Sequence, residues 1–369
     1  MKTILHVIDT TGPGGAETVF IDLIRGLDIE KYRAIVLIRG KGWVYDTLIQ
    51  HGIKPFIIEA KGSFNWKYLL KVARLIRAEK VDLIQSHLLG SNIYSSLAGL
   101  ITAVPVVATF HGAVDIGENE RFKWLKFKIL NAGISQMLAV SNNLKLDMLN
   151  RTIVNKNKLS VIYNGIPTSD FIIEPNNRIR KSYEWEDGDI IVGSLGNIRT
   201  AKAYNILLEA AAIIKSKSLP YRFVIAGQGN NELHTQLLKQ RHSLGLDDTV
   251  HFLGFNDKPA EFLSNLSIFL LTSSSEGFSI ATIQAMASGL PVIATKSGGP
   301  EEIISHQTDG YLVDINNPTA IAEALEIVNT NTKLKHDMAE AGRIKALKQF
   351  DISKMLASYE QLYESILHA

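Results

Sequence analysis

The feature that most limits what this chain can fold into is a regular alternation of short apolar runs with longer amphipathic segments. Several runs, such as 190–192 and 268–271, are apolar at consecutive positions, as in parallel strands that are covered on both faces. Strands that alternate with helices indicate βαβ units and therefore an α/β fold. We expect strands at 4–9, 33–39, 54–59, 83–87, 104–111, 136–141, 160–164, 190–196, 221–227, 249–254, 267–272, 291–295 and 310–314.

The length of the chain, 369 residues, fits about two domains, since a domain usually holds roughly 100–200 residues. The apolar pattern fades between residues 166 and 189, so we place the linker at about 166–172. This predicts an N-terminal domain at 1–168 and a C-terminal domain at 169–350, each doubly wound with six or seven strands. Apolar residues at spacings of three and four predict a helix within 351–369, which could pack back on the N-terminal domain.

The composition excludes several classes of protein. The chain has no cysteine, which excludes a disulfide scaffold, an iron–sulfur cluster, a zinc finger and thiol catalysis. Its 39 basic and 37 acidic residues give a net charge of +2, so no strong field for nucleic acid is expected. No zinc-protease helix, Walker loop or Gly-x-Ser-x-Gly elbow occurs. The chain starts with too short an apolar run for a signal peptide, and we expect a cytoplasmic protein.

The first candidate site is the glycine-rich turn after the first expected strand, where Gly14 and Gly15 precede a helix. Glycines there let the backbone approach a ligand, and a helix N-terminus favours anions. Ala16 and Glu17 follow where the dinucleotide fingerprint needs further glycine, which disfavours a nicotinamide enzyme. On position alone, a tight turn and a ligand loop explain this segment equally well.

The second candidate is the serine-rich segment 272–287, in which Glu276 lies just before a helix that begins near Ser279. The unpaired amides of a helix start suit a diphosphate, and an acid beside them can bind hydroxyl groups. Taken alone, Glu276 is better explained as an acid that complements the helix dipole.

The third candidate is a pair of cations, Arg199 and Lys202, which follow the first strand of the second half. In a chain without a metal motif, a leaving diphosphate needs such cations, although a single one would usually be a solvated loop charge. Asp187 and Asp189 formally fit a metal site, but we predict a turn there. The basic and aromatic segment 121–128 is expected to be a solvated helix face, with membrane contact as the alternative.

These segments together resemble one family along nearly the whole chain. The most specific part runs from Glu276 to Ala294: an acid, seven residues, Gln284, and then Ala-Met-Ala-Ser-Gly-Leu-Pro-Val-Ile-Ala. Further matching segments lie at 14–17, 109–112, 140–141, 163–166, 298–303 and 309–313. The chain resembles the retaining glycosyltransferases of family 4, also called glycosyl transferases group 1. The resemblance implies the GT-B fold, in which two Rossmann-like, doubly wound domains face each other across a cleft.

The resemblance also implies roles for single residues. His111 would lie near the transferred sugar, Arg199 and Lys202 would neutralise the leaving diphosphate, and Glu276 would bind hydroxyls of the donor sugar. Backbone groups would hold the rest of the donor, at Gly14, Gly15, Gly254, Phe278, Ser279, Ile280, Ala281 and Thr282. The donor would be a nucleotide-diphosphate sugar, with UDP as the expected nucleotide, and no metal or other cofactor is implied.

Two positions depart from the family pattern. The second acid, which holds the ribose, is Gln284 here, and an amide cannot supply a charge-assisted hydrogen bond. The first arginine of the loop at 196–203 is Asn197, which leaves open whether Arg199 replaces it. These changes bear on donor affinity more than on the fold.

The resemblance therefore implies a metal-independent, retaining hexosyltransferase that acts on a glycan or lipid-linked acceptor in surface polysaccharide synthesis. It would work in the cytoplasm, with the inner face of the membrane as an alternative site. Two other classes stay open: a non-catalytic partner subunit that lost the ribose acid, and a nucleotide-sugar epimerase of the same fold. The retained His111, Arg199, Lys202 and Glu276 speak against the first, and the 276–294 segment against the second.

Overall fold

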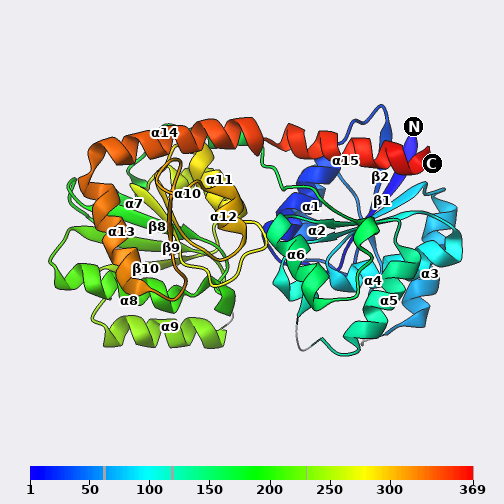
Figure 1. Cartoon of the computed structure of the whole chain (residues 1–369), viewed down its shortest axis with the longest axis horizontal. Helices are drawn as coiled ribbons and strands as arrows, with labels where there is room; N and C mark the ends of the chain where they lie inside the picture. The colour runs from blue at the N-terminus through cyan, green and yellow to red at the C-terminus, as the bar shows by residue number, and fades with distance from the viewer. Residues whose placement is uncertain (61–63, 118–119, 230, 369) are drawn as a thin grey trace. The chain divides into compact units, whose positions relative to one another are not determined.

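The computed structural model describes residues 1–60, 64–117, 120–229 and 231–368 (Figure 1). Within these residues the chain forms two compact units. Unit 1 consists of Met1–Gly165 together with Ile352–Ala369, and unit 2 of Ile166–Asp351. Each unit is built around one parallel sheet.

The sheet of unit 1 has seven strands in the order β3-β2-β1-β4-β5-β6-β7, all paired in parallel. The chain builds outward from β1 in one direction and then, from β4 on, in the other. The switch point of this doubly wound sheet therefore lies between β1 and β4. The strands are β1 (Lys2–Ile8), β2 (Tyr32–Ile38), β3 (Phe56–Ile57), β4 (Leu83–His87), β5 (Val106–Phe110), β6 (Gln136–Ala139) and β7 (Leu159–Val161).

Helices connect these strands as parallel pairing requires. They are α1 (Gly15–Gly26), α2 (Trp43–Gln50), α3 (Trp66–Ala78), α4 (Leu89–Thr102), α5 (Lys123–Gly133) and α6 (Asn142–Arg151). The last helix of the chain, α15 (Ile352–Leu367), also belongs to this unit and packs beside α1 (Figure 1). It buries Met355, Tyr359 and Tyr363, which stand four residues apart and so lie on one face of the helix.

The sheet of unit 2 has six parallel strands in the order β10-β9-β8-β11-β12-β13, so its switch point lies between β8 and β11. The strands are β8 (Ile190–Leu195), β9 (Tyr221–Ala226), β10 (Val250–Gly254), β11 (Ile268–Leu271), β12 (Val292–Thr295) and β13 (Tyr311–Val313). The helices are α7 (Arg178–Ser182), α8 (Tyr204–Ser216), α9 (Asn231–Ser243), α10 (Pro259–Leu263), α11 (Ile280–Ala287), α12 (Gly299–Ile303), α13 (Pro318–Thr330) and α14 (Thr332–Gln349).

Each of the thirteen expected apolar runs coincides with a strand, and the predicted α/β class with two Rossmann-like sheets is confirmed. The predicted turn at Asp187 is also present, and the Asp189 carboxylate there accepts a hydrogen bond from Arg222 at 3.1 Å. Residues 166–172, where we expected a linker, pack on unit 2. Ile166 and Phe171 are buried, and the short helix Thr168–Phe171 contacts α11.

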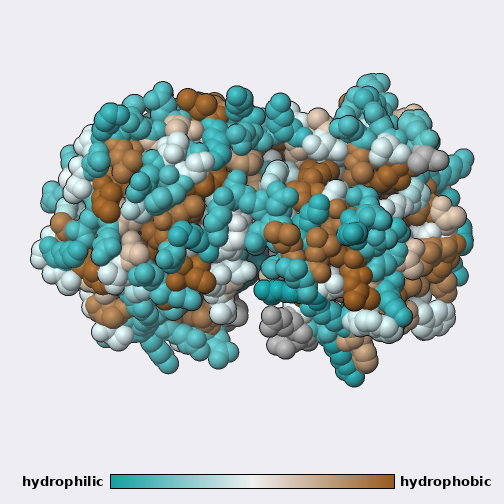
Figure 2. Space-filling view, in the orientation of Figure 1, coloured by the Kyte–Doolittle hydropathy of each residue, from teal (hydrophilic) through white to brown (hydrophobic). Residues whose placement is uncertain are grey.

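Among the described residues, no helix combines the length and the apolar content needed to cross a bilayer. On the face drawn in Figure 2, apolar side chains reach the surface in several separate patches rather than in one belt.

Candidate functional site

The switch point of unit 2 brings two of the predicted site residues together. Lys202 ends the loop after β8, and Glu276 lies in the loop after β11, the neighbouring strand. The Lys202 Nζ lies 2.7 Å from Glu276 Oε1, and both side chains are mostly buried. The Ser273 hydroxyl donates a second hydrogen bond to the same oxygen, at 2.6 Å. The carboxyl ends of β8 and β11 therefore carry a partly desolvated ion pair at the place where open α/β sheets bind ligands.

Backbone hydrogen bonds fix the two loops to each other. The amide of Ser274 donates to the carbonyl oxygen of Ala201 at 2.8 Å, and the Thr272 hydroxyl donates to that of Lys202 at 3.0 Å. The loop after β12 also holds Glu276 in place. The Glu276 amide donates a hydrogen bond to the carbonyl oxygen of Ser297, and the Glu276 carbonyl oxygen accepts one from the Gly299 amide. A Cβ on Gly299 would come within 2.8 Å of the Phe278 Cα, which explains why glycine stands there.

Helix α11 begins directly after this loop. Ser279 caps it: its hydroxyl oxygen accepts a hydrogen bond from the Thr282 amide at 3.3 Å. The amides of Ile280 and Ala281 belong to the first turn, whose N–H groups have no partner within a helix. The start of α11 is thus a candidate site for an anion, four residues after Glu276 in the sequence.

The remaining predicted residues of unit 2 lie in different surroundings. The Phe278 ring is buried and packs against Phe350 with centroids 5.7 Å apart, so only its backbone could meet a ligand. Gln284 is buried in the second turn of α11. Gly254 ends β10, two strands from β8, with a φ of +76° that favours glycine.

The two loop cations are not equivalent. Arg199 is exposed, and among the described residues its side chain makes no hydrogen bond or ion pair. Asn197, at the family's arginine position, has a structural role, because its side-chain oxygen accepts from the Gln228 amide at 3.2 Å. The structure therefore connects Lys202, and not Arg199, to Glu276.

In unit 1 the predicted glycines and His111 lie at the carboxyl edge of the sheet. Gly14 precedes α1, and the Glu17 carboxylate occupies the space where a Cβ on Gly14 would stand. His111 follows β5, and its amide donates to the Asp115 carboxylate at 2.7 Å. Its ring nitrogen Nε2 lies 2.9 Å from Nδ1 of His87.

His87 was not among the predicted residues. The available signal was the end of β4, where Gln85, Ser86 and His87 are polar in a strand whose residues are all fully buried. Buried polar side chains need partners, and such a run predicts a hydrogen-bond network. Ser273 was missed because a serine run reads as an ordinary loop.

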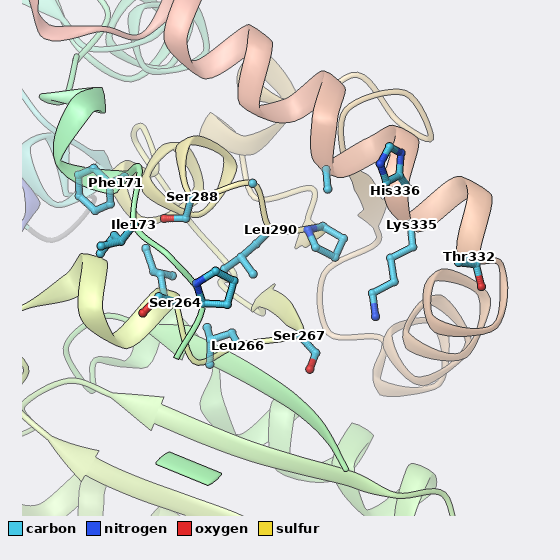
Figure 3. A pocket seen from close by; sticks show the side chains of 15 residues that line it. Phe171, Ile173, Ser264, Leu266, Ser267, Ser288, Leu290, Thr332, Lys335 and His336 are labelled. Carbon is cyan, nitrogen blue, oxygen red and sulfur yellow. The ribbon is translucent and has the colours of Figure 1, made fainter. Parts of the chain in front are cut away.

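A separate cavity of about 500 Å³ lies at the opposite edge of the unit 2 sheet (Figure 3). Ser267 and Pro291, which directly precede β11 and β12, line it together with Lys335 and His336 of α14. None of the predicted site residues is part of it. Among the residues that the structure describes, no group of three or more His, Cys, Asp or Glu side chains could hold a metal ion.

Comparison with known proteins places this geometry in a family. The model for glycosyltransferase family 4 matches residues 13–170, and the model for glycosyl transferases group 1 matches residues 175–345. The N-acetyl-alpha-D-glucosaminyl L-malate synthase of Bacillus anthracis is 28% identical over 80% of this chain and 78% of its own. The UDP-Gal:alpha-D-GlcNAc-diphosphoundecaprenol alpha-1,3-galactosyltransferase of Escherichia coli is 26% identical over 81% of this chain and 79% of its own.

A solved structure agrees in fold. Anabaena HepE, in complex with UDP and glucose, superposes with a TM-score of 0.89 at 23% identity, and the match covers 99% of this chain and 100% of HepE. The conclusion rests on the two parallel-sheet units, on the ion pair at the switch point of unit 2 and on the two matching family models. The chain belongs to the family 4, group 1 glycosyltransferases and has the GT-B fold.

Proposed function

We propose that this chain is a retaining, metal-independent hexosyltransferase that uses a nucleotide-diphosphate sugar, with a UDP-sugar as the donor. The observation that carries the proposal is the Lys202–Glu276 pair, at the switch point of unit 2 and next to the start of α11. Lys202 supplies a positive charge for the diphosphate, and the first-turn amides of α11 supply hydrogen-bond donors. Glu276, held by Lys202 and Ser273, offers its carboxylate to the hydroxyls of the sugar.

The proposed reaction needs no nucleophile from the protein. The bond between the anomeric carbon and the diphosphate oxygen breaks, and the acceptor oxygen forms its new bond on the same face. The acceptor proton passes to the departing phosphate oxygen. Lys202 and the α11 amides stabilise the negative charge that builds up on the diphosphate, in the manner of an oxyanion site. His111 contacts the transferred sugar, and Gly254 borders the base.

The acceptor is proposed to be a glycan or a lipid-linked glycan, in the synthesis of a surface polysaccharide. This follows the names of relatives, among them a capsular polysaccharide biosynthesis glycosyltransferase of Staphylococcus aureus, 24% identical over 88% of this chain. A cytoplasmic location, or one at the inner face of the membrane, would give access to both nucleotide sugars and such acceptors.

The proposed function is tested by thermal unfolding with a panel of nucleotide sugars. A ligand at 100 times its dissociation constant adds about 2.7 kcal/mol, which raises the midpoint clearly. We expect UDP-sugars to stabilise the protein, and transfer to continue in the presence of a chelator with retention at the anomeric carbon. Stabilisation by no nucleotide sugar would contradict the donor class. Loss of activity with chelator, or an inverted product, would contradict the mechanism.

Gln284 gives a prediction about the ribose. A neutral amide binds hydroxyls more weakly than a carboxylate, by roughly 1 kcal/mol, so Gln284→Glu should change donor affinity by no more than about tenfold and keep activity. Donor titrations of the wild type, Gln284→Glu and Gln284→Ala measure this. If the wild type bound no nucleotide sugar and Gln284→Glu did, the chain would be a non-catalytic partner subunit.

Contact with the membrane is proposed through the segment 121–128 at the start of α5. Phe122, Trp124 and Leu125 are 64%, 60% and 50% exposed, which is unusual for such large apolar side chains. Cations stand beside two of these rings: Lys128 Nζ lies 3.8 Å from the Trp124 centroid, and the Arg121 guanidinium 4.9 Å from that of Phe122. Apolar side chains with cations close by suit an anionic lipid surface.

A sedimentation assay with vesicles tests this contact. We expect the protein to bind phosphatidylglycerol vesicles but not phosphatidylcholine vesicles, and to bind less at high salt. The double variant Trp124→Ala, Leu125→Ala should weaken binding by about tenfold or more, since it removes two apolar side chains that would be buried in the lipid. The control is Ile344→Ala, which removes an exposed apolar side chain from α14 of unit 2. Equal losses in both variants would show nonspecific adsorption.

A further inference from the structure

A continuous row of buried polar side chains lies on one face of the unit 1 sheet. Gln85 and His87 from β4 and Thr109 from β5 point to this face, which α1 and α15 cover. Tyr359 and Tyr363 of α15 contact this row through their hydroxyl groups, and both side chains are buried. Because buried polar groups are costly unless paired, the partners in this row are fixed.

Hydrogen bonds connect the row from α15 to His111. The Tyr363 hydroxyl donates to Gln85 Oε1 at 3.0 Å, and Gln85 Nε2 donates to the Thr109 hydroxyl at 2.9 Å. Gln85 Nε2 also lies 3.2 Å from Nε2 of His87. On the far side of that ring, His87 Nδ1 lies 2.9 Å from Nε2 of His111.

The orientation of the Gln85 amide decides where the protons are. Its Nε2 faces the carbonyl oxygen of Ser86 at 3.4 Å, and a carbonyl oxygen can only accept. Turning the amide around would set two acceptors against each other there. The amino group of Gln85 therefore points toward His87, and its oxygen toward the Tyr363 hydroxyl, which donates.

The proton on His87 follows from this orientation. The Gln85 amino group has two hydrogens, which go to its two nearer contacts, the Thr109 hydroxyl at 2.9 Å and His87 Nε2 at 3.2 Å, while the Ser86 carbonyl at 3.4 Å serves only to show which end of the amide faces this side. His87 Nε2 therefore accepts and has no hydrogen, and the proton of the neutral ring lies on Nδ1. His87 Nδ1–H then donates to His111 Nε2, which leaves the proton of His111 on its own Nδ1. Burial lowers the pKa of both histidines from 6.5, that of His87 well below it, so both rings are neutral at physiological pH.

We infer that Gln85, His87 and Tyr363 are positioning residues that hold His111 as the Nδ1–H tautomer, with that N–H directed to a ligand oxygen. This inference rests on the proposed function only for the identity of the ligand, a hydroxyl of the transferred sugar. Among the described residues Nδ1 of His111 has no hydrogen-bond partner, so it is available to a ligand. A ring with its one free nitrogen protonated donates a hydrogen bond and cannot accept the acceptor's proton. His111 is thereby excluded as the general base.

The test is a proton–nitrogen correlation spectrum of the ligand-free protein with labelled histidine, which distinguishes the two neutral tautomers. The signals of His87 and His111 are identified by their loss in His87→Asn and His111→Asn. We expect both rings to show the Nδ1–H pattern in the wild type. An Nε2–H pattern for His111 would overturn the inference, and this measurement does not depend on any enzymatic activity.

Two tyrosine variants on the same helix provide the matched comparison. Tyr363→Phe removes the donor that holds Gln85, so the tautomers of His87 and His111 should become mixed. Tyr359→Phe removes the same atom from an equally buried ring, but Tyr359 contacts Thr109 rather than Gln85, and both patterns should persist. Unchanged patterns in Tyr363→Phe, or the same change in both variants, would overturn the role of Tyr363.

Variants of His87 separate positioning from structural support. His87→Leu removes the donor to His111 and should lower turnover by about tenfold with donor KM little changed. His87→Asn keeps an N–H near the position of Nδ1, and it should restore both the His111 tautomer and most of the turnover. Restoration of the tautomer without turnover would overturn the link to catalysis. If no nucleotide sugar is a substrate, the proposed function fails while the spectra still decide the tautomer.

Discussion

Lys202→Ala is expected to lower turnover by about 10²–10³-fold, the usual cost of removing one group that stabilises charge in a transition state. Lys202 is the cation that the structure places beside Glu276 at the switch point of unit 2. Its charge counters the negative charge that grows on the departing diphosphate, and this need is greatest in the transition state. The loss should therefore appear in kcat more than in donor KM.

Lys296→Ala is the matched control for this experiment. Lys296 follows β12 in the same unit and also pairs with an acid, Asp314 at 2.8 Å, but both side chains are at least half exposed. An ion pair in contact with water contributes little to stability, so this variant should keep both activity and stability. Turnover of Lys202→Ala within about tenfold of wild type, measured per folded molecule, would show that Lys202 is only a loop residue.

Glu276→Gln is expected to reduce turnover by at least about 10²-fold while preserving the shape of the side chain. The carboxylate makes two short hydrogen bonds, with Lys202 Nζ and the Ser273 hydroxyl, and both are charge-assisted. An amide would weaken both and bind the sugar hydroxyls less strongly. Glu323→Gln on α13, where the glutamate is exposed, should have no effect. Normal turnover of Glu276→Gln would remove this residue from the site.

Comparing the single variants with the double variant tests whether Lys202 and Glu276 act together. Residues that act as one unit show losses that do not add. We expect Lys202→Ala, Glu276→Gln to be only slightly slower than the worse single variant. Fully additive losses would mean that the ion pair has no part in placing the two groups.

The strands of both sheets could be predicted from the sequence because a parallel strand that is buried on both faces consists of consecutive apolar residues. The runs at 190–192 and 268–271 became β8 and β11, and every other expected run also contains a strand. The packing of residues 166–172 on unit 2 could not be predicted from the sequence in the same way. Its proline and asparagines suggested a linker, yet Ile166 and Phe171 are buried, and only the folded unit shows what they pack against.

The candidate site was partly predictable. The sequence shows that Lys202 and Glu276 each follow a strand, but strand order decides that β8 and β11 are neighbours, and strand order is not local information. His87 was missed for the same reason, since it matters through His111, which follows another strand. Ser273 lies in the same loop as its partner Glu276 and was missed because a serine run gives no sign of which hydroxyl meets the carboxylate. For Gly14 and Gly15 the sequence did show the motif. It did not show that the Glu17 carboxylate lies against Gly14, in the space that a Cβ there would need.

The place of α15 has a consequence for the order of folding during synthesis. Unit 2 is one continuous segment, so its core can close as soon as residues 166–351 have left the ribosome. Unit 1 combines two segments that lie on either side of unit 2 in the sequence, so its sheet face keeps Gln85 and Thr109 without the tyrosines of α15 until residues 352–367 have emerged. Until then the nascent chain exposes a polar and apolar surface that belongs in a core. Unit 1 therefore completes its core later than unit 2, although its larger segment is synthesised before unit 2.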